Sequence, residues 1–476
     1  MNRCSFKVVI VGGSIAGLTL AHGLEKLGID YVVLEKRSDI APQEGASIGI
    51  MPNGGRILEQ LGIFNAVEAS IEPLDSAHVA WPDGYSFSTR APDILNERFG
   101  FPLAFLERQR FLQILYASLP GKSKVFLNKS MIRLEPYNDG QVRVHTQDGS
   151  FYDGHLVVGA DGVHSQTRSE MWRIAESLQP GLITQSEKNA MTVEYACTFG
   201  ISASVNGMSI GEQVTMIDDG ICLLTFPGKL DRVYWFMMEK LDQKYSYGSA
   251  PRYSLENTVN RCDQLADRKA WKNDRFEEVW RKRVAFSKTA LEENLFVRWH
   301  FGRIVCIGDS MHKLAPNTGQ GANCAIEDAA SLLNLLNDYL ASDTKPSDPA
   351  LDARLQRFAE VRVRRMHKIC QGARLVVRIH ARDGLLMKLF GRYYMPYAKN
   401  LAVNRASEAI AGAEFLNFLP LPIRSGPGWI SYRSHPRSIN LQFGAILSIL
   451  VAMLLYFSAP YLSSRQSKVY ITNKTF

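Results

Sequence analysis

The stretch FKVVIVGGSIAGL, residues 6–18, decides the fold of this chain. Its first half is a continuous apolar and largely β-branched run, as expected of a strand buried on both faces of a parallel sheet. After the glycine-rich turn at 12–17, apolar residues recur at helical spacing as far as Gly28, and a second apolar run follows at 31–35. The order of strand, tight turn, helix and strand predicts a βαβ unit over residues 6–35.

The turn of this unit has the features of a dinucleotide site. Such a turn needs small residues at three positions, because the backbone bends sharply, approaches a pyrophosphate and packs a helix close to the sheet. Gly12 and Gly17 occupy the first and third positions, and Ser14 occupies the middle one. Glu35 ends the second strand, where a carboxylate can accept hydrogen bonds from a ribose hydroxyl. The sequence therefore predicts a nucleotide whose phosphates lie at the helix N-terminus.

Two later segments repeat the pattern of an apolar strand that ends in a turn of small residues. The first, LVVGADGVHSQTR at 156–168, places Asp161 at the strand end. The second, RIVCIGDSMHKLAPNTGQGAN at 303–323, places Asp309 in the same position and leads into a long apolar helix that starts near Gly321 and Ala322. Acids at strand ends of an α/β sheet lie on the ligand side, and a helix N-terminus attracts anions.

Composition indicates a globular protein of two or three domains, because 476 residues with 46% hydrophobic and 21% charged residues can bury a substantial core. The formal charge of +8 could indicate an anionic partner. However, the basic residues Arg362, Arg364, Arg365 and Lys368 alternate with apolar ones in a helical pattern. We interpret this group as a solvated helix face and expect no nucleic-acid partner.

The seven cysteines are scattered and form no C-x-x-C pair, so neither a metal site nor a disulfide framework is expected. This usage fits a reducing compartment. Only residues 1–5 precede the first strand, which leaves no room for a cleavable signal. We therefore expect the catalytic part of the chain on the cytosolic side of any membrane.

The three strand-turn motifs, taken together and in this order, resemble the group A flavoprotein monooxygenases, which are single-component FAD hydroxylases and epoxidases. Within that family, the sequences VGGSIAGL at 11–18, EKR at 35–37 and QEGAS at 43–47 look most like the fungal epoxidases of meroterpenoid and indole-diterpene pathways. Those enzymes oxidise a terminal alkene of a farnesyl or geranylgeranyl chain. Ser14 is also what this subgroup has in the middle turn position.

The resemblance assigns roles to individual residues. Glu35 would bind the FAD ribose, Asp309 the ribityl-pyrophosphate region, and Ala322 the flavin end. Gly49 and Arg108 would contact the cofactor as well. The full set of predicted cofactor-binding residues is Gly12, Ser14, Gly17, Glu35, Gly49, Arg108, Asp161, Asp309, Gly321 and Ala322.

The resemblance also implies the reaction. NADPH or NADH would reduce FAD, O2 would add to form a flavin hydroperoxide, and its distal oxygen would pass to an electron-rich double bond. No second glycine-rich βαβ unit is present in the sequence, so the nicotinamide donor would dock transiently. Tyr195 and Tyr234 lie on predicted strands and are the candidate catalytic residues, with core packing as the alternative. His312 is interpreted as a structural hydrogen-bonding residue.

We therefore predict an α/β (α+β) protein: a Rossmann-like FAD-binding domain, an inserted β-sheet domain that binds substrate, C-terminal helices and a transmembrane helix. Strand patterns dominate 191–241 and support the second sheet. The FAD-binding domain would comprise 1–75, 107–185 and 296–340, and the substrate domain 76–106 and 186–295. A helical region at 341–425 and a transmembrane helix at 439–462 would follow.

The predicted membrane anchor rests on composition. Residues 438–464 contain no charged side chain, and basic residues flank them on both sides. This length crosses a bilayer. A single-pass C-terminal anchor in the endoplasmic reticulum is expected, and a buried or amphipathic core helix is the alternative. An anchor suits a prenylated substrate, which partitions into membranes.

The sequence leaves rival functions open. An FAD-dependent aromatic hydroxylase would share the same motifs, and so would a flavin-binding membrane scaffold without turnover. A squalene-type epoxidase usually carries its membrane segment before the nucleotide unit, and a flavin halogenase would carry a W-x-W-x-I-P segment that is missing here.

Overall fold

The computed structural model describes residues 6–137, 140–272, 274–342, 348–398 and 400–433. The chain divides into two units at 429/430, and the elements below belong to the first unit except for the end of α14. The first sheet of the larger unit has six strands in the order β20-β21-β12-β1-β2-β8. All neighbours in this sheet pair in parallel except β20 and β21. The strands are β1 Lys7–Val11, β2 Asp30–Leu34, β8 Val125–Phe126, β12 Leu156–Gly159, β20 His300–Phe301 and β21 Ile304–Cys306.

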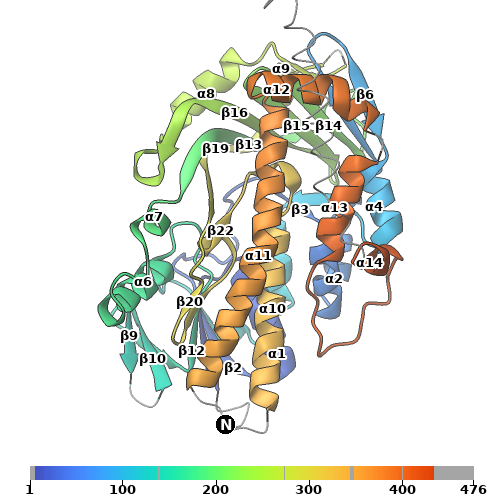
Figure 1. The fold of residues 1–476 in the computed structure, drawn as a ribbon. Coiled ribbons are helices and arrows are strands. Elements are labelled where there is room, and N and C mark those ends of the chain that lie inside the picture. The colour runs from blue at the N-terminus through green and yellow to red at the C-terminus, as the bar shows by residue number, and fades with distance from the viewer. Residues whose placement is uncertain (1–5, 138–139, 273, 343–347, 399, 434–476) are drawn as a thin grey trace, which may run out of the picture. The chain divides into compact units, whose positions relative to one another are not determined.

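The second large sheet has eight strands in the order β22-β19-β13-β16-β15-β14-β5-β6. Figure 1 shows it above the six-stranded sheet, with the helix α11 running along both. Its long central strands pair antiparallel, and only β5 and β14 pair in parallel. The strands are β5 Ser76–Ala80, β6 Ser86–Thr89, β13 Thr192–Ala203, β14 Glu212–Asp218, β15 Ile221–Gly228, β16 Arg232–Ser246, β19 Arg283–Leu295 and β22 His312–Lys313.

Three small sheets complete the strand content. One is an antiparallel meander of β9, β10 and β11. Another places β3 and β4 on either side of β7. The strands are β9 Met131–Tyr137, β10 Gln141–Thr146, β11 Phe151–Gly154, β3 Ser47–Ile50, β4 Glu72–Pro73, β7 Ala104–Glu107, β17 Lys269–Trp271 and β18 Asp274–Arg275.

Helices pack against both large sheets. The helix α1 of the βαβ unit packs against α10, and a Cβ built on Gly23 would lie only 2.0 Å from Leu333 Cδ1. Glycine at that position therefore permits the close approach of the two helices. The helices are α1 Ile15–Leu27, α2 Pro52–Gln60, α3 Phe64–Glu68, α4 Ala91–Phe99, α5 Arg108–Ala117, α6 Gln166–Leu178, α7 Gln185–Lys188, α8 Leu255–Gln264, α9 Phe276–Arg281, α10 Gly321–Ala341, α11 Asp348–His380, α12 Gly384–Leu389, α13 Leu401–Ala411 and α14 Gly428–Ser431.

The mixed α/β fold and the βαβ unit at 6–35 are confirmed, since β1, α1 and β2 fill that range. The segment Ser47–Ile50 forms the strand β3 because it pairs with β7. The strand β19 was not predicted, because its charged residues give no continuous alternation. The domain boundaries stay a prediction.

Across the residues that the structure describes, no helix is both long enough and apolar enough to span a bilayer. The predicted transmembrane helix at 439–462 lies outside the described residues.

A buried network of ion pairs joins α10 to α11. Arg362 on α11 is fully buried, and its Nη1 donates to Glu327 Oε2 at 3.0 Å while its Nε donates to Asp328 Oδ1 at 2.6 Å. Arg365 adds a bond to Glu327 at 2.5 Å. Burial alone would raise the pKa of Glu327 and Asp328. The guanidinium groups of Arg365 and Arg362 outweigh burial at Glu327 and hold its pKa below the usual range, and Arg362 with His312 does the same for the pKa of Asp328.

The interpretation of the basic residues on α11 as a solvated face is therefore wrong for two of them. Arg362 is fully buried and Arg365 is largely covered, while Arg364 and Lys368 are exposed. The sequence pattern misled because the acids that neutralise these cations lie on another helix. A charged residue enters a core only when such a partner is present.

We expect the substitution Arg362→Met to destabilise the protein strongly. It would leave Glu327 and Asp328 buried with one cation fewer, which costs about 3–5 kcal/mol of unfolding free energy when a buried pair is broken. Chemical denaturation followed by circular dichroism measures this. The matched change Arg364→Met, at an exposed position of the same helix, should alter stability by less than about 0.5 kcal/mol. Equal effects of the two changes would contradict the role given to the network.

Candidate functional site

The turn after β1 is held closed by contacts that only glycine permits. Gly12 has a φ of +107°, and a Cβ built on it would lie 2.4 Å from the carbonyl oxygen of Ala160. A Cβ on Gly17 would lie 2.0 Å from the carbonyl oxygen of Gly12. The turn after β1 and the turn after β12 are therefore in contact at Gly12 and Ala160. Because the turn consists of small residues, its backbone can approach a phosphate at the N-terminus of α1.

Glu35 is buried at the end of β2 and ties the turn to the second strand. Its Oε2 accepts from the backbone N–H of Gly13 at 2.8 Å, and its Oε1 accepts from the backbone N–H of Arg37 at 2.9 Å. A carboxylate offers about four acceptor positions. These bonds leave capacity for a ribose hydroxyl beside the turn, as the sequence predicts for this residue.

Ser14 and Arg108 meet although they lie far apart in the chain. Arg108, the first residue of α5, donates from Nη2 to Ser14 Oγ at 3.1 Å and from Nη1 to the carbonyl oxygen of Glu44 at 3.2 Å. Burial, aided by nearby Arg37, lowers the pKa of the Arg108 guanidinium. Among the described residues no carboxylate forms an ion pair with Arg108 within 4.0 Å. A cation placed in this way beside a helix N-terminus is suited to a pyrophosphate.

Asp161 is engaged within its own turn. Its Oδ1 accepts from Ser165 Oγ at 2.6 Å, and its Oδ2 accepts from Thr167 at 2.9 Å (N) and 3.0 Å (Oγ1), which caps the start of α6. Arg168 then reaches the third motif and donates to the carbonyl oxygen of Ser310 at 2.5 Å. The turn that follows β12 therefore serves mainly to hold the start of α6 and the third motif in place.

Asp309 lies on a short 3₁₀ turn, η5 (Gly308–Ser310), directly after β21, and forms an ion pair with Lys313 through Oδ2. Burial would raise its pKa, but Lys313 outweighs this and holds the pKa of the carboxyl below its usual range. The neighbouring His312 is fully buried and bonds through Nε2 to Asp328 Oδ2 at 2.7 Å, as a structural hydrogen-bonding residue does. Asp309 is therefore ionised and can accept from a hydroxyl group.

The loop before α10 is clamped to β3 by one buried side chain. Asn323 donates to the carbonyl oxygens of Gly49 at 2.9 Å and Gly319 at 2.7 Å, and its Oδ1 accepts from the backbone N–H of Met51 at 3.0 Å. No atom lies within 4 Å of a Cβ built on Gly321. The N-terminus of α10, with Gly321 and Ala322, is thus open on the side where a planar ring could approach.

An apolar pocket opens beside this loop. Two loop atoms at its wall, Asn317 Oδ1 and Thr318 Oγ1, are buried and have no hydrogen-bond partner among the described residues. Such atoms indicate a polar ligand group. The pocket is lined by Met51, Leu103, Phe105, Gln213, Leu224, Phe226, Phe236, Met238, Pro316, Asn317, Thr318 and Gly319.

His380, the last residue of α11, supports the loop from behind. Burial lowers its pKa to about 4, so the imidazole is neutral at pH 7. Its Nδ1 can then accept from Asn317 Nδ2, which lies 3.0 Å away. This bond directs the amide oxygen of Asn317 elsewhere, and that oxygen is one of the two unpartnered atoms.

The two candidate catalytic tyrosines are buried in one hydrophobic cluster with several pocket residues. The hydroxyl of Tyr195 donates to Asp383 Oδ2 at 2.8 Å. Burial raises the pKa of Tyr234 to about 12. Neither residue lines the pocket itself.

Several residues of the site carried no sequence signal. Phe105 and Phe226 stack at a centroid distance of 3.9 Å in the pocket wall, although they come from β7 and β15. His380 lies 63 positions from Asn317. Only Asn323 had a detectable signal, because it closes the glycine-rich motif at 319–323.

Comparison with known proteins places this geometry among flavoproteins. Residues 5–353 match the family described as FAD binding domain. The chain is 52% identical to the FAD-dependent monooxygenase olcE of Penicillium canescens, over 96% of this chain and 99% of that protein. It is 55% identical to the FAD-dependent monooxygenase spyC of Aspergillus fumigatus, over 90% and 91% respectively. The crystal structure of Klebsiella pneumoniae HpxO, complexed with FAD and uric acid, matches the fold with a TM-score of 0.71 and 22% identity, covering 86% of this chain and 97% of that one.

We expect Arg108→Gln to weaken FAD binding about 10- to 100-fold, because a hydrogen bond to a charged group contributes about 1.5–3 kcal/mol. Titration of the apoprotein with FAD, followed by flavin fluorescence, gives the Kd. The matched change Arg110→Gln, on the exposed side of the same helix α5, should leave the Kd unchanged. An unaltered Kd for Arg108→Gln would show that the guanidinium does not face the cofactor.

Proposed function

Since this chain belongs to the family of FAD-dependent monooxygenases, we propose that it epoxidises the prenyl chain of a lipophilic precursor in secondary metabolism. The prenyl chain would be a farnesyl or geranylgeranyl group of a meroterpenoid or indole-diterpene precursor. The observation that carries this proposal is the character of the pocket beside the 316–322 loop.

None of the pocket's lining residues in the described part of the chain is an acid, a base or a charged side chain. Hydroxylation of a phenol is assisted when a nearby base removes the phenol proton. An alkene needs no such group, because its double bond is already electron-rich. Aliphatic and aromatic walls also favour a hydrocarbon chain, which they remove from water.

The overall reaction would balance with NADPH or NADH as a transient co-substrate. The donor supplies a hydride, which is two electrons with one proton, and solvent supplies a second proton; one oxygen atom of O2 enters the alkene as an epoxide, and the other leaves as water. FAD supplies the redox chemistry when bound. The N-terminus of α10 can stabilise negative charge on a reduced cofactor by up to about 2 kcal/mol.

The cofactor-binding residues are proposed in three groups. Gly12, Ser14, Gly17 and Arg108 would hold the pyrophosphate. Glu35 and Asp309 would accept from hydroxyl groups of the ribose and the ribityl chain, with Asp161 fixing the turn between them. The backbone at Gly49, Gly321 and Ala322 would lie against the flavin.

The proposal includes the domain organisation that the sequence predicts. Residues 1–75, 107–185 and 296–340 would bind FAD, 76–106 and 186–295 would bind substrate, and 341–425 would brace both. The uncharged segment at 439–462 would anchor the protein to the endoplasmic reticulum, and its composition supports this. Such an anchor would keep the catalytic part on the cytosolic side.

The test is product analysis with the full-length, FAD-loaded protein. Farnesylated and geranylgeranylated candidates should stimulate NADPH or NADH oxidation and gain one oxygen atom, which tandem mass spectrometry should locate on the prenyl chain. The matched control is the same compound with its prenyl chain hydrogenated, which should gain none. Oxygen on the ring would indicate an aromatic hydroxylase. Absence of substrate-stimulated oxidation would indicate a non-catalytic flavin-binding scaffold.

A second test concerns the tyrosines. We propose that Tyr195 and Tyr234 position the pocket wall from behind. Tyr195→Phe should cost about 0.5–1.5 kcal/mol of stability, because the bond to Asp383 is lost. Both Tyr→Phe changes should alter kcat less than about tenfold, since a proton-transferring group contributes about 10²–10⁴-fold. Steady-state kinetics check this, and a drop of kcat within that larger range would instead place the hydroxyl at the reacting atoms.

A further inference from the structure

The pocket beside the loop before α10 is walled on one side by the eight-stranded sheet. Four residues of this wall, Leu224 and Phe226 of β15 and Phe236 and Met238 of β16, are apolar. Gln213 of β14 lines the same wall. Among the described residues that this sheet contributes to the pocket, it is the only one with a polar side chain. An amide is an exception in such a wall, because a hydrocarbon chain offers it no hydrogen bond.

The register of the sheet turns Gln213 toward the pocket. Val214, Thr225 and Trp235 pair in one row across β14, β15 and β16, and Val214 and Trp235 are buried in the same hydrophobic cluster. Successive side chains of a strand point to opposite faces of a sheet. Gln213 and Phe226, which neighbour that row, therefore share the other face, where both line the pocket. The amide of Gln213 thus lies beside an aromatic ring of the pocket wall.

The side-chain amide of Gln213 has no hydrogen-bond partner in the part of the chain that the structure describes. Other glutamines are engaged. Nε2 of Gln60 donates to the carbonyl oxygen of Leu416 at 2.9 Å, and Nε2 of Gln109 donates to that of Ala41 at 3.0 Å. A polar group that is covered and left without a partner weakens binding by more than a neutral hydrogen bond strengthens it. The pocket therefore favours a ligand that brings a hydrogen-bonding group to this wall.

The two other polar residues of the pocket lie in a different setting. Asn317 and Thr318 belong to the loop before α10, against whose open end the flavin is proposed to bind. The Asn317 amide is already oriented, because its Nδ2 lies 3.0 Å from Nδ1 of His380. Gln213 belongs to the sheet that is proposed to bind substrate, and no described residue fixes its amide. This amide is therefore available to the substrate.

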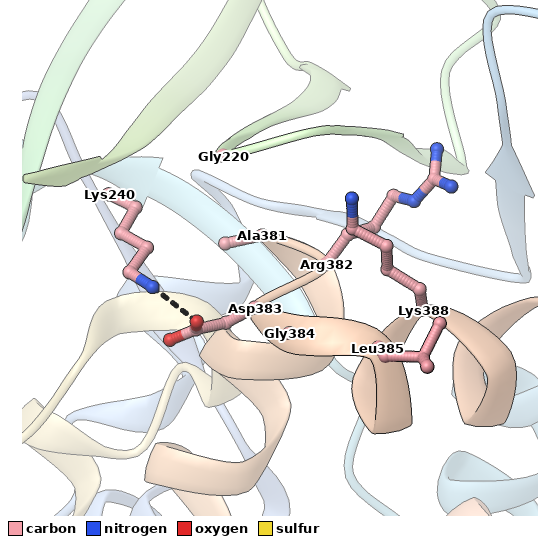
Figure 2. Close-up of a pocket in the computed structure, with 8 residues that line it drawn as sticks. All are labelled: Gly220, Lys240, Ala381, Arg382, Asp383, Gly384, Leu385 and Lys388. Atoms are coloured by element: carbon pink, nitrogen blue, oxygen red, sulfur yellow. Dashed lines mark hydrogen bonds and ion pairs between the residues drawn. The ribbon is translucent and has the colours of Figure 1, made fainter. Parts of the chain in front are cut away.

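Another hollow of the described chain, at the start of α12, gives the contrast. Figure 2 shows Lys240 on one side of it, paired with Asp383. On the other side Arg382 and Lys388 each lie 3.2 Å from Asp219. The charged groups that line this hollow are thus already paired, and they select no ligand. The unpaired amide of Gln213 distinguishes the substrate pocket from it.

We propose that Gln213 is a specificity-determining residue whose amide hydrogen-bonds an oxygen atom on the ring system that carries the prenyl chain. This inference rests on the proposed function and adds the class of substrate, which is an amphiphile with an oxygen-bearing ring and a hydrocarbon chain. A plain polyprenyl hydrocarbon would leave the amide unpaired. A site built to hydrogen-bond its substrate rejects an analogue that lacks the bonding group, whereas apolar walls discriminate weakly.

The experiment measures binding without turnover. Full-length, FAD-loaded protein is dialysed to equilibrium, without a nicotinamide donor, against a farnesylated phenol and against the same compound with hydrogen in place of the hydroxyl group. The Kd of the deoxy compound is divided by the Kd of the phenol. This ratio should be about 5- to 100-fold higher for the unaltered protein than for Gln213→Leu, because only the unaltered protein leaves an amide unpaired against the deoxy compound. Comparing ratios cancels the different hydration of the two compounds.

The matched control is Gln243→Leu, the same change at an exposed position of β16, which should keep the ratio of the unaltered protein. Gln213→Asn retains an amide and should restore part of the ratio that Gln213→Leu loses. Flavin absorbance confirms that each variant is folded and loaded.

Two results would overturn the role of Gln213: an unchanged ratio in Gln213→Leu, and an equal fall of the ratio in Gln243→Leu. Either result would leave the proposed function standing if tandem mass spectrometry still places the new oxygen atom on the prenyl chain. A fall confined to Gln213→Leu, with the new oxygen atom on the ring, would support the role of Gln213 and refute the epoxidation. Failure of the unaltered protein to bind either compound would overturn both.

Discussion

The buried ion pairs between α10 and α11 are the interaction on which the rest of the site depends. Asp328 accepts from Arg362 on one side, and on the other its Oδ2 accepts from the backbone N–H of Gly308 at 2.8 Å and from His312. Glu327 accepts from Asn53 of α2 at 2.7 Å. Two buried carboxylates are tolerable because their oxygens are satisfied by cations and N–H donors. The same bonds fix the turn that carries Asp309 and the start of α10.

This arrangement explains why the loop before α10 can be open and yet well placed. Its far side is held by the ion pairs and by Asn323, so no side chain needs to fill the space in front of Gly321. A binding site is precise when its residues are locked by the shell behind them. The stability of the core and the geometry of the site therefore have a common source in α10.

The sequence predicts what is local and misses what is distant. The βαβ unit was readable because strand, turn, helix and Glu35 lie within thirty-five residues and each has its own pattern. Ser14 meets Arg108 across 94 positions, and Asn323 meets Gly49 across 274. Contacts of that kind leave no periodic trace in one sequence. The prediction that Arg362 is solvated was wrong for the same reason. A helical alternation of basic and apolar residues is typical of a solvated face unless its acidic partners on another element are known.

The helix α11 joins two features that the sequence presents separately. Its middle supplies Arg362 to the buried network, and its end supplies the neutral His380 behind Asn317. A neutral imidazole is the form that can accept from the Asn317 amide, and desolvation is what keeps it neutral. An apolar pocket in which no lining residue titrates suits oxygen transfer to a hydrocarbon, because the protein has to orient and exclude water and does not have to move a proton.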